Sequence, residues 1–338
     1  RIYAAVSQKG TAEGNFFVSE DGGSTWAQVE NAHNDEMPFR LKFDSQSNVY
    51  VTYGNNEGPW NCAVGTVIKY SASDKSATEV TPLKDSVGDI VIDPTNDNNL
   101  MYVTTGIWKE QPNHAFGDEF YVSKDGGKNW TNVRETMTMT TNGMPWIEDC
   151  AIHWCCSLCI NPFNPNEIMV TSGNGIYACD NIWDEAPEFY FNALGLEETV
   201  PEDIISMKDY PLITAAGDYD GFVHEDLTTP AQRHNDKIGS TTSIAVAAQN
   251  RDYWAKVGGS DKEQLLTYST DAGKTWTKIT NSPEPGKVLY RGRLAFTADG
   301  SRLIWSSSNS FKASSRSAFS SSLFPELLIL SDGSEAIL

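Results

Sequence analysis

The fold is decided by the stretch Ser123-Lys124-Asp125-Gly126-Gly127-Lys128-Asn129-Trp130, whose fixed positions read Ser-x-Asp-x-Gly-x-x-Trp. The same four positions recur at residues 19–26 and at residues 269–276. Three copies of one spaced pattern indicate an internal repeat rather than chance.

Each copy has the chemistry of a tight hairpin turn. The Asp carboxylate accepts hydrogen bonds from backbone N–H groups of its own turn, and the glycines adopt the positive φ that such turns need. The tryptophan is expected to fold back and fill the gap between neighbouring sheets. We therefore assign this Asp box a structural role, carried by Asp21, Trp26, Asp125, Trp130, Asp271 and Trp276.

The spacing of the copies predicts further repeats. The first two boxes lie two steps of about 52 residues apart, and the last two lie three steps of about 49 apart. Degraded copies fall at residues 71–75, 178–183 and 223–227. A period near 50 with four short strands per unit is typical of a β-propeller. We predict an all-β propeller of about seven four-stranded blades, the last one partial near residues 292–307.

Short strand pairs support this period, and no long amphipathic helix interrupts them. Each pair reads as strand, polar turn, strand. The pairs are residues 40–44 with 49–52, residues 89–94 with 101–104, and residues 157–162 with 168–171.

Composition excludes some partners. The 338 residues hold 25 Lys and Arg against 45 Asp and Glu, a net charge of -20, so a nucleic-acid partner is not expected. No run approaches the roughly 20 apolar residues that span a bilayer, so we expect no membrane partner either. The 10 Trp and 13 Tyr are compatible with a sugar-binding cleft, although propellers also use them for packing.

Four of the six cysteines lie close together, at Cys150, Cys155, Cys156 and Cys159. The Cys-x-x-Cys pair invites a zinc interpretation, but no second pair follows it, so we expect no metal site. The residues around Cys159 favour a buried strand in which cysteine acts as a small apolar side chain. A disulfide within the cluster is compatible with secretion.

The stretch from Gly195 to Leu227 is more specific. It reads Gly-Leu-Glu-Glu-Thr at residues 195–199, Gly-Asp-Tyr-Asp-Gly-Phe at residues 217–222 and His-Glu-Asp-Leu at residues 224–227. This order resembles glycoside hydrolase family 74, in which Gly-Leu-Glu-Glu-Thr leads to Gly-Asp-x-Gly-Gly-Phe and then His-Asp-Asp-Leu. The similarity extends over residues 1–309.

Members of that family are secreted xyloglucan hydrolases, endo-acting or reducing-end-specific, with two seven-bladed propellers and a cleft between them. The resemblance implies that residues 1–148 are the last blades of a first propeller and residues 149–309 the first blades of a second. We expect residues 310–338 to be a Ser-rich irregular tail. The resemblance also implies xyloglucan as the partner and no cofactor, and we expect a monomer.

The resemblance also implies the catalytic groups. Inverting glycosidases use one carboxylic acid to protonate the leaving oxygen and a second carboxylate to activate water. The first of these maps to Asp218, which we assign as general acid. Asp220 stands where the family usually has Gly, and a carboxylate there would modulate the acidity of Asp218 or crowd the cleft. We find no counterpart of the second carboxylate, so we expect this chain to begin inside a domain and to be inactive alone.

Loop aromatics are the candidates for substrate binding, because propellers place binding groups on the loops between short strands. We select Tyr53, Trp60, Trp108 and Trp154, although burial as packing is the commoner fate of such residues. His153 and His224 have no nucleophilic Ser partner and are interpreted as hydrogen-bonding residues.

Two other functions remain open. An Asp-box propeller of the sortilin-receptor kind would bind peptide or protein without any catalytic pair. A sialidase would need an arginine cluster for the sialic carboxylate, and arginines are few here, so it ranks last.

Overall fold

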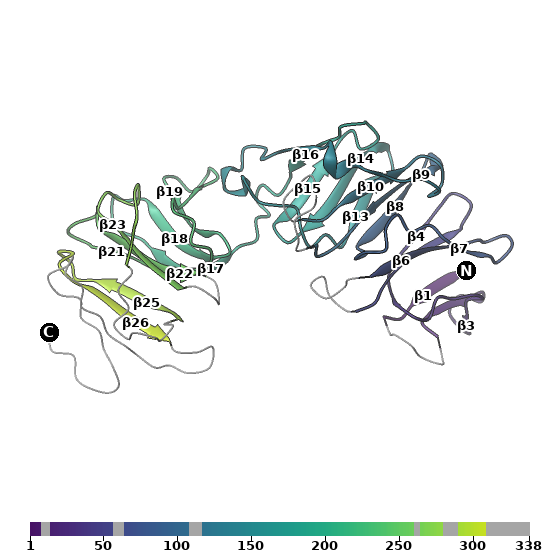
Figure 1. The fold of residues 1–338 in the computed structure, drawn as a ribbon, viewed down its shortest axis with the longest axis horizontal. Helices are drawn as coiled ribbons and strands as arrows, with labels where there is room; N and C mark the ends of the chain where they lie inside the picture. Colours follow the sequence, from purple (N-terminus) through teal and green to yellow (C-terminus); the bar gives the residue numbers. More distant parts are fainter. Residues whose placement is uncertain (8–13, 57–63, 108–116, 260–263, 280–289, 309–338) are drawn as a thin grey trace. The chain divides into compact units, whose positions relative to one another are not determined.

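The computed structural model describes residues 1–7, 14–56, 64–107, 117–259, 264–279 and 290–308. Within these ranges the chain is all-β, and its helical elements are the short 3-10 turns η1 (Val133–Glu135) and η2 (Pro145–Ile147). Each sheet occupies its own part of the sequence, as the colours of Figure 1 show. This confirms the predicted all-β class with several four-stranded antiparallel sheets. No helix in these ranges is long and apolar enough to cross a bilayer.

The described residues form two compact units. The first comprises residues 1–142 and 147–197, and the second comprises residues 143–146 and those from 198 onward. The predicted boundary near residue 148 concerns the assignment of blades to two propellers, which this division does not address, so it stays a prediction. The predicted tail, residues 310–338, lies outside the described residues.

The first unit contains four sheets, in which consecutive strands pair antiparallel. Their strands are β1 (Ile2–Ala5), β2 (Phe16–Ser19), β3 (Ala27–Gln28); β4 (Met37–Phe43), β5 (Val49–Gly54), β6 (Gly65–Tyr70), β7 (Ala77–Glu79); β8 (Asp89–Asp93), β9 (Asn96–Val103), β10 (Phe120–Ser123), β11 (Thr131–Asn132); and β13 (Leu158–Asn161), β14 (Asn164–Ser172), β15 (Gly175–Cys179), β16 (Glu188–Phe191). A fifth strand, β12 (Thr138–Thr140), joins the last sheet by pairing parallel with β16.

The second unit contains two four-stranded sheets and a two-stranded one. Their strands are β17 (Val200–Ile205), β18 (Leu212–Gly217), β19 (Asp220–His224), β20 (Gln232–Arg233); β21 (Thr241–Val246), β22 (Trp254–Gly259), β23 (Gln264–Ser269), β24 (Thr277–Lys278); and β25 (Tyr290–Phe296), β26 (Leu303–Ser308). The two-stranded sheet lies where the partial blade was predicted.

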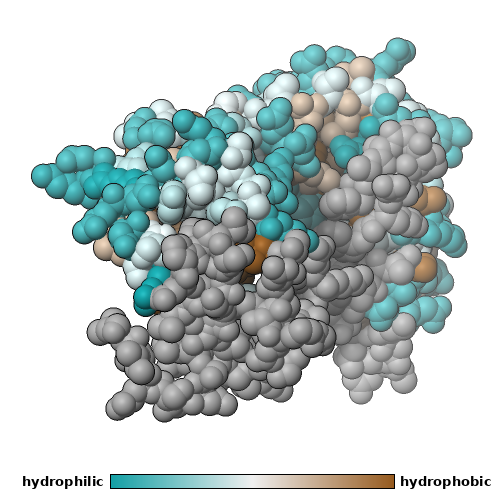
Figure 2. Space-filling view, turned by 60° about the vertical axis from the view of Figure 1, so that its left-hand side comes forward, coloured by the Kyte–Doolittle hydropathy of each residue, from teal (hydrophilic) through white to brown (hydrophobic). Residues whose placement is uncertain are grey.

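Neighbouring sheets stack face to face, and β5 shows how. All six of its residues are buried, because its side chains alternate between two covered faces. Val49, Val51 and Tyr53 join the cluster shared with β1–β3. Tyr50 joins the cluster shared with β8–β11. The coloured residues of Figure 2 are mostly hydrophilic, with a few hydrophobic ones among them.

Each Asp box closes the turn between the last two strands of its sheet. In the central box the carboxylate of Asp125 accepts from the N–H of Asn129 at 2.9 Å and from the hydroxyl of Ser123 at 2.9 Å. These hydrogen bonds, led by that from Asn129, lower the pKa of Asp125 to about 2. Asp21 and Asp271 make the corresponding contacts. The degraded copies at residues 71–75, 178–183 and 223–227 fall in the same connection.

The tryptophans of the boxes differ in their surroundings. Trp130 packs against the cluster between two sheets and donates to the carbonyl of Val80 on the preceding one. Trp276 likewise joins the cluster formed by β18, β21 and β22. Trp26 is 45 % exposed and belongs to none of the described core clusters, and its Nε1 donates to the carbonyl of Gly23 in its own turn at 3.2 Å.

Candidate functional site

Asp218 lies at the tip of the hairpin that joins β18 to β19. Ala216 pairs with Asp220 across the two strands, so residues 217–219 make the turn. Asp218 has φ +65° and its side chain is exposed. Its backbone N–H donates to the hydroxyl of Ser240 at 3.0 Å, and that hydroxyl donates to Asp218 Oδ1 at 3.3 Å. An exposed carboxylate at a hairpin tip is accessible to a ligand.

Asp220, two residues away, is fully buried and differently engaged. Its Oδ2 accepts from Nη2 of Arg233 at 3.0 Å. Its Oδ1 accepts from the backbone N–H groups of Ile238 at 2.5 Å and Gly239 at 2.8 Å. A buried carboxylate with one cationic and two amide donors is well satisfied. Its hydrogen bonds therefore run to Arg233 and to the turn at residues 238–239.

Aromatic groups support the same hairpin. Tyr219 lies between the two aspartates in sequence and is partly exposed. The ring of the buried Trp146 meets the Tyr219 ring edge to face, with the centroids 5.1 Å apart. The Arg233 guanidinium lies 5.6 Å from the centroid of Tyr219, and its Nε donates to the Tyr219 carbonyl. Arg233 therefore holds both the backbone and the ring of the hairpin.

Two buried basic groups follow in the same unit. Nζ of Lys256 donates to the carbonyls of Asn235 and Asp236 and lies 4.5 Å from the centroid of Trp276. Burial lowers the pKa of Lys256 to about 8. Burial also lowers the pKa of His234 to about 3, which keeps that imidazole neutral. Both side chains are buried, and the bonds of Lys256 hold the segment that follows Arg233.

The predicted substrate-binding aromatics fare differently. Tyr53 is fully buried, and its hydroxyl lies 2.7 Å from that of Tyr70. A ring with no exposed face offers nothing for a sugar to stack on, so burial argues against the predicted role. Trp154 is 37 % exposed, and the centroid of its ring lies 5.9 Å from that of the His153 ring. Trp60 and Trp108 lie outside the described residues.

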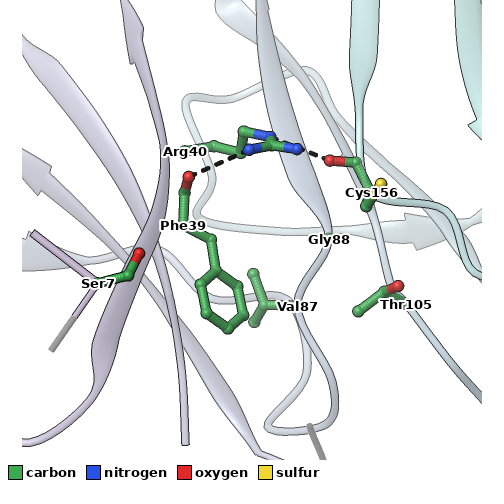
Figure 3. A pocket seen from close by; sticks show the side chains of 7 residues that line it. All are labelled: Ser7, Phe39, Arg40, Val87, Gly88, Thr105 and Cys156. Atoms are coloured by element: carbon green, nitrogen blue, oxygen red, sulfur yellow. Dashed lines mark hydrogen bonds between the residues drawn. The ribbon is translucent and has the colours of Figure 1, made fainter. Parts of the chain in front are cut away.

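A separate cavity of about 210 Å³ opens in the first unit. Figure 3 shows Arg40 at its rim, donating to the carbonyl oxygens of Phe39 at 3.4 Å and Cys156 at 3.0 Å. The other lining residues are Ser7, Val87, Gly88 and Thr105. These described lining residues include no carboxylate, so they cannot supply the acid and base of glycoside hydrolysis.

No disulfide joins the described members of the cysteine cluster to one another. No group of three His, Cys, Asp or Glu side chains in the described ranges is arranged to hold a metal. The prediction that Cys159 is buried was wrong. The alternation along β13 buries Leu158 and turns Cys159 outward.

Known proteins of similar sequence and structure cover most of the chain. The BNR/Asp-box repeat model matches residues 267–278. A curated xyloglucanase of a Paenibacillus species is 28 % identical over 91 % of this chain and 33 % of its own length. The crystal structure of a glycoside hydrolase family 74 enzyme from Niastella koreensis is 34 % identical over 94 % of this chain and 44 % of its own, with a TM-score of 0.81. A family 74 xyloglucanase from Xanthomonas campestris is 28 % identical over 92 % and 46 %, with a TM-score of 0.79.

This chain is homologous to glycoside hydrolase family 74. It spans about a third to a half of the length of the relatives that it matches. The structural match implies a propeller architecture for this chain, in agreement with its four-stranded antiparallel sheets.

The sequence alone did not indicate three residues of this chain that contact the β18–β19 hairpin. Arg233 and Ser240 lie in stretches without a motif, and Trp146 precedes the hairpin by a long interval. A lone arginine and a lone serine carry no local signal. They become visible because β20 pairs with β19 and because the segment after β20 returns to the hairpin.

Proposed function

We propose that this chain carries the general-acid part of a xyloglucan-cleaving site, with Asp218 as the acid. The observation that carries the proposal is the exposed Asp218 carboxylate at the tip of the β18–β19 hairpin, in the segment that resembles the family motif. The homology of the chain to family 74 enzymes supports it. The substrate class is the β-1,4-glucan backbone of xyloglucan.

The chemistry is inverting hydrolysis with two carboxyl groups roughly 6.5–9.5 Å apart. Asp218 would protonate the leaving oxygen while the second carboxylate activates water from the opposite face. A carboxyl group at a tight turn is held on rigid strands but reaches solvent, which suits proton transfer to a bound polymer.

The second carboxylate is part of the proposal as well. We propose that a segment of a first propeller outside this sequence supplies it, and that this chain is inactive by itself. Residues 1–148 would then be the last blades of that propeller and residues 149–309 the first blades of the next. Because the polymer lies outside the cell, the proposal includes secretion, and the protein would act as a monomer.

The test combines binding with cleavage. The chain would be titrated with a xyloglucan oligosaccharide and incubated with xyloglucan, alone and joined to the N-terminal part of the Paenibacillus relative. We expect binding in both forms and cleavage only in the joined form. Asp218→Asn should lower cleavage roughly 10²–10⁴-fold, the usual contribution of general acid catalysis.

The matched control is Asp226→Asn, which changes an exposed aspartate in the turn after the same hairpin. It should leave cleavage unchanged. Full activity of Asp218→Asn in the joined form would refute the role of Asp218. Cleavage by the chain alone would refute the proposal that the second carboxylate lies outside this sequence. Absence of binding, together with capture of a protein partner, would favour the receptor-like alternative.

A further inference from the structure

The hairpin that carries Asp218 is strained at two positions. Asp218 has φ +65° and Asp220 has φ +64°, in the left-handed region that favours glycine. At the second position the pattern of the related family has Gly. Side chains persist in such conformations when surrounding contacts fix them.

The contacts of Asp220 join the hairpin to the turn that leads into β21. The buried carboxylate of Asp220 accepts from the N–H groups of Ile238 and Gly239, and the Asp220 N–H donates to the Gly239 carbonyl at 3.0 Å. The other carboxylate oxygen, Oδ2, forms an ion pair with Nη2 of Arg233 at 3.0 Å. The turn at residues 238–239 thus both donates hydrogen bonds to Asp220 and accepts one from it.

The next residue after this turn touches the candidate acid. Ser240 follows Gly239 directly, and its hydroxyl accepts from the Asp218 N–H at 3.0 Å and donates to Asp218 Oδ1 at 3.3 Å. The Ser240 carbonyl is held in turn by the N–H of Gly259 at 2.9 Å. Hydrogen bonds therefore link Asp220 to Gly239 and Ser240 to Asp218, and the peptide bond between Gly239 and Ser240 connects the two pairs.

We infer that Asp220 is a positioning residue, which sets the direction of the Asp218 carboxylate by fixing Ser240. The significance of that direction for hydrolysis rests on the proposed function, but the link between the two aspartates does not. Since the hydrogen bonds of the Asp220 carboxylate run to Arg233 and the turn amides, its influence on Asp218 is exerted through position.

The first test measures amide hydrogen exchange in the full chain at single-residue resolution. Asp220→Gly removes all three side-chain bonds and should speed exchange of the Asp218 and Gly239 amides at least about tenfold. Asp220→Asn keeps an oxygen for Ile238 and Gly239, so it should restore most of the protection. Ser240→Ala, a small change that leaves the Asp220 contacts in place, should speed exchange at Asp218 alone.

The matched control is Asp203→Asn. Oδ2 of Asp203 accepts from the Ser243 hydroxyl at 2.7 Å and the Ile244 N–H at 3.3 Å, so these bonds run to β21 rather than to Ser240 or Asp218. It should leave the Asp218 amide unchanged. The core strand β22 reports folding in every variant. An unchanged Asp218 amide in Asp220→Gly would overturn the inference, whatever Ser240→Ala shows.

The second test separates positioning from general stability. Asp220→Gly should weaken binding of a xyloglucan oligosaccharide about tenfold, and the loss should vanish in an Asp218→Ala background. An equal loss in both backgrounds would mean that Asp220 does not act through Asp218. If the unaltered chain binds no oligosaccharide, the proposed function fails, and the exchange measurement still decides the link between the aspartates.

Discussion

The carboxylate of Asp118 accepts a hydrogen bond of 2.7 Å from the backbone N–H of Cys155. It also accepts from the Ile107 N–H at 3.1 Å and the Thr104 hydroxyl at 3.3 Å. One buried side chain thus ties the segment before β13 to the segment after β9. Burial outweighs these bonds and raises the pKa of Asp118 to about 6.

We expect this burial to appear in the pH dependence of stability. The ordinary pKa of Asp is 3.8, so the folded state binds the proton more readily than the unfolded state. The gain is complete below about pH 4 and is lost as the pH rises through about 6, a difference on the order of 3 kcal/mol. Urea unfolding from pH 4 to 7 should show this slope, and Asp118→Asn should lack it. Parallel profiles for the two proteins would contradict the prediction.

Trp130→Ala should destabilise the first unit far more than Trp26→Ala. Trp130 packs into the cluster between two sheets, whereas Trp26 is largely exposed. We expect a loss of about 3 kcal/mol in the free energy of unfolding for Trp130→Ala and less than about 1 kcal/mol for Trp26→Ala. Chemical denaturation followed by circular dichroism measures both, and similar losses would contradict the packing described for Trp130.

Gly221→Ala should disrupt the hairpin of the candidate site. A Cβ there would lie 1.9 Å from the Thr214 carbonyl oxygen and 2.8 Å from the Ala215 Cα, on a backbone with φ +133°. Backbone atoms of a paired strand cannot move aside without breaking the sheet. We therefore expect the free energy of unfolding to fall by more than about 3 kcal/mol. Gly195→Ala is the control, because Gly195 has φ +79° but open space around it. It should cost about 1–2 kcal/mol, the cost of left-handed backbone alone. Equal losses would show that the overlap at Gly221 is relieved.

The cysteines should differ in reactivity. Burial raises the pKa of the Cys155 thiol well above its usual range, and burial raises the pKa of Cys179 to about 11. Cys156 and Cys159 are exposed. Since the thiolate is the nucleophile, brief treatment with iodoacetamide at pH 8 should label the exposed pair and spare the buried pair until urea is added. Mass spectrometry of peptides reports this, and early labelling of Cys155 would contradict its burial.

Local chemistry explains what the sequence could predict. The Asp boxes were predictable because Ser, Asp and Gly act within eight residues, and in all three boxes the Asp carboxylate accepts from a backbone N–H of its own turn. The strand pairs were also predictable, since each is a hairpin of neighbouring segments.

Distant contacts explain the rest. Arg233 lies 13 residues from Asp220 in the sequence, and Ile238 lies 18 residues away. The residues next to Asp220 therefore do not predict its buried ion pair. Tyr53 was expected in a loop because Gly54 and Asn55 follow it. The strand continues through Gly54 and both of its faces are covered, which only the stacking of sheets decides.

The parallel strand β12 has a consequence for synthesis of the chain. Its partner β16 leaves the ribosome only after β13, β14 and β15, so Thr138–Thr140 must wait for three later strands before it can bond. Once it does, the outer edge of that sheet is covered by a segment from earlier in the chain. A nascent polypeptide cut off before Glu188 would leave both strands β12 and β15 with open edges, the form most prone to pair with other chains.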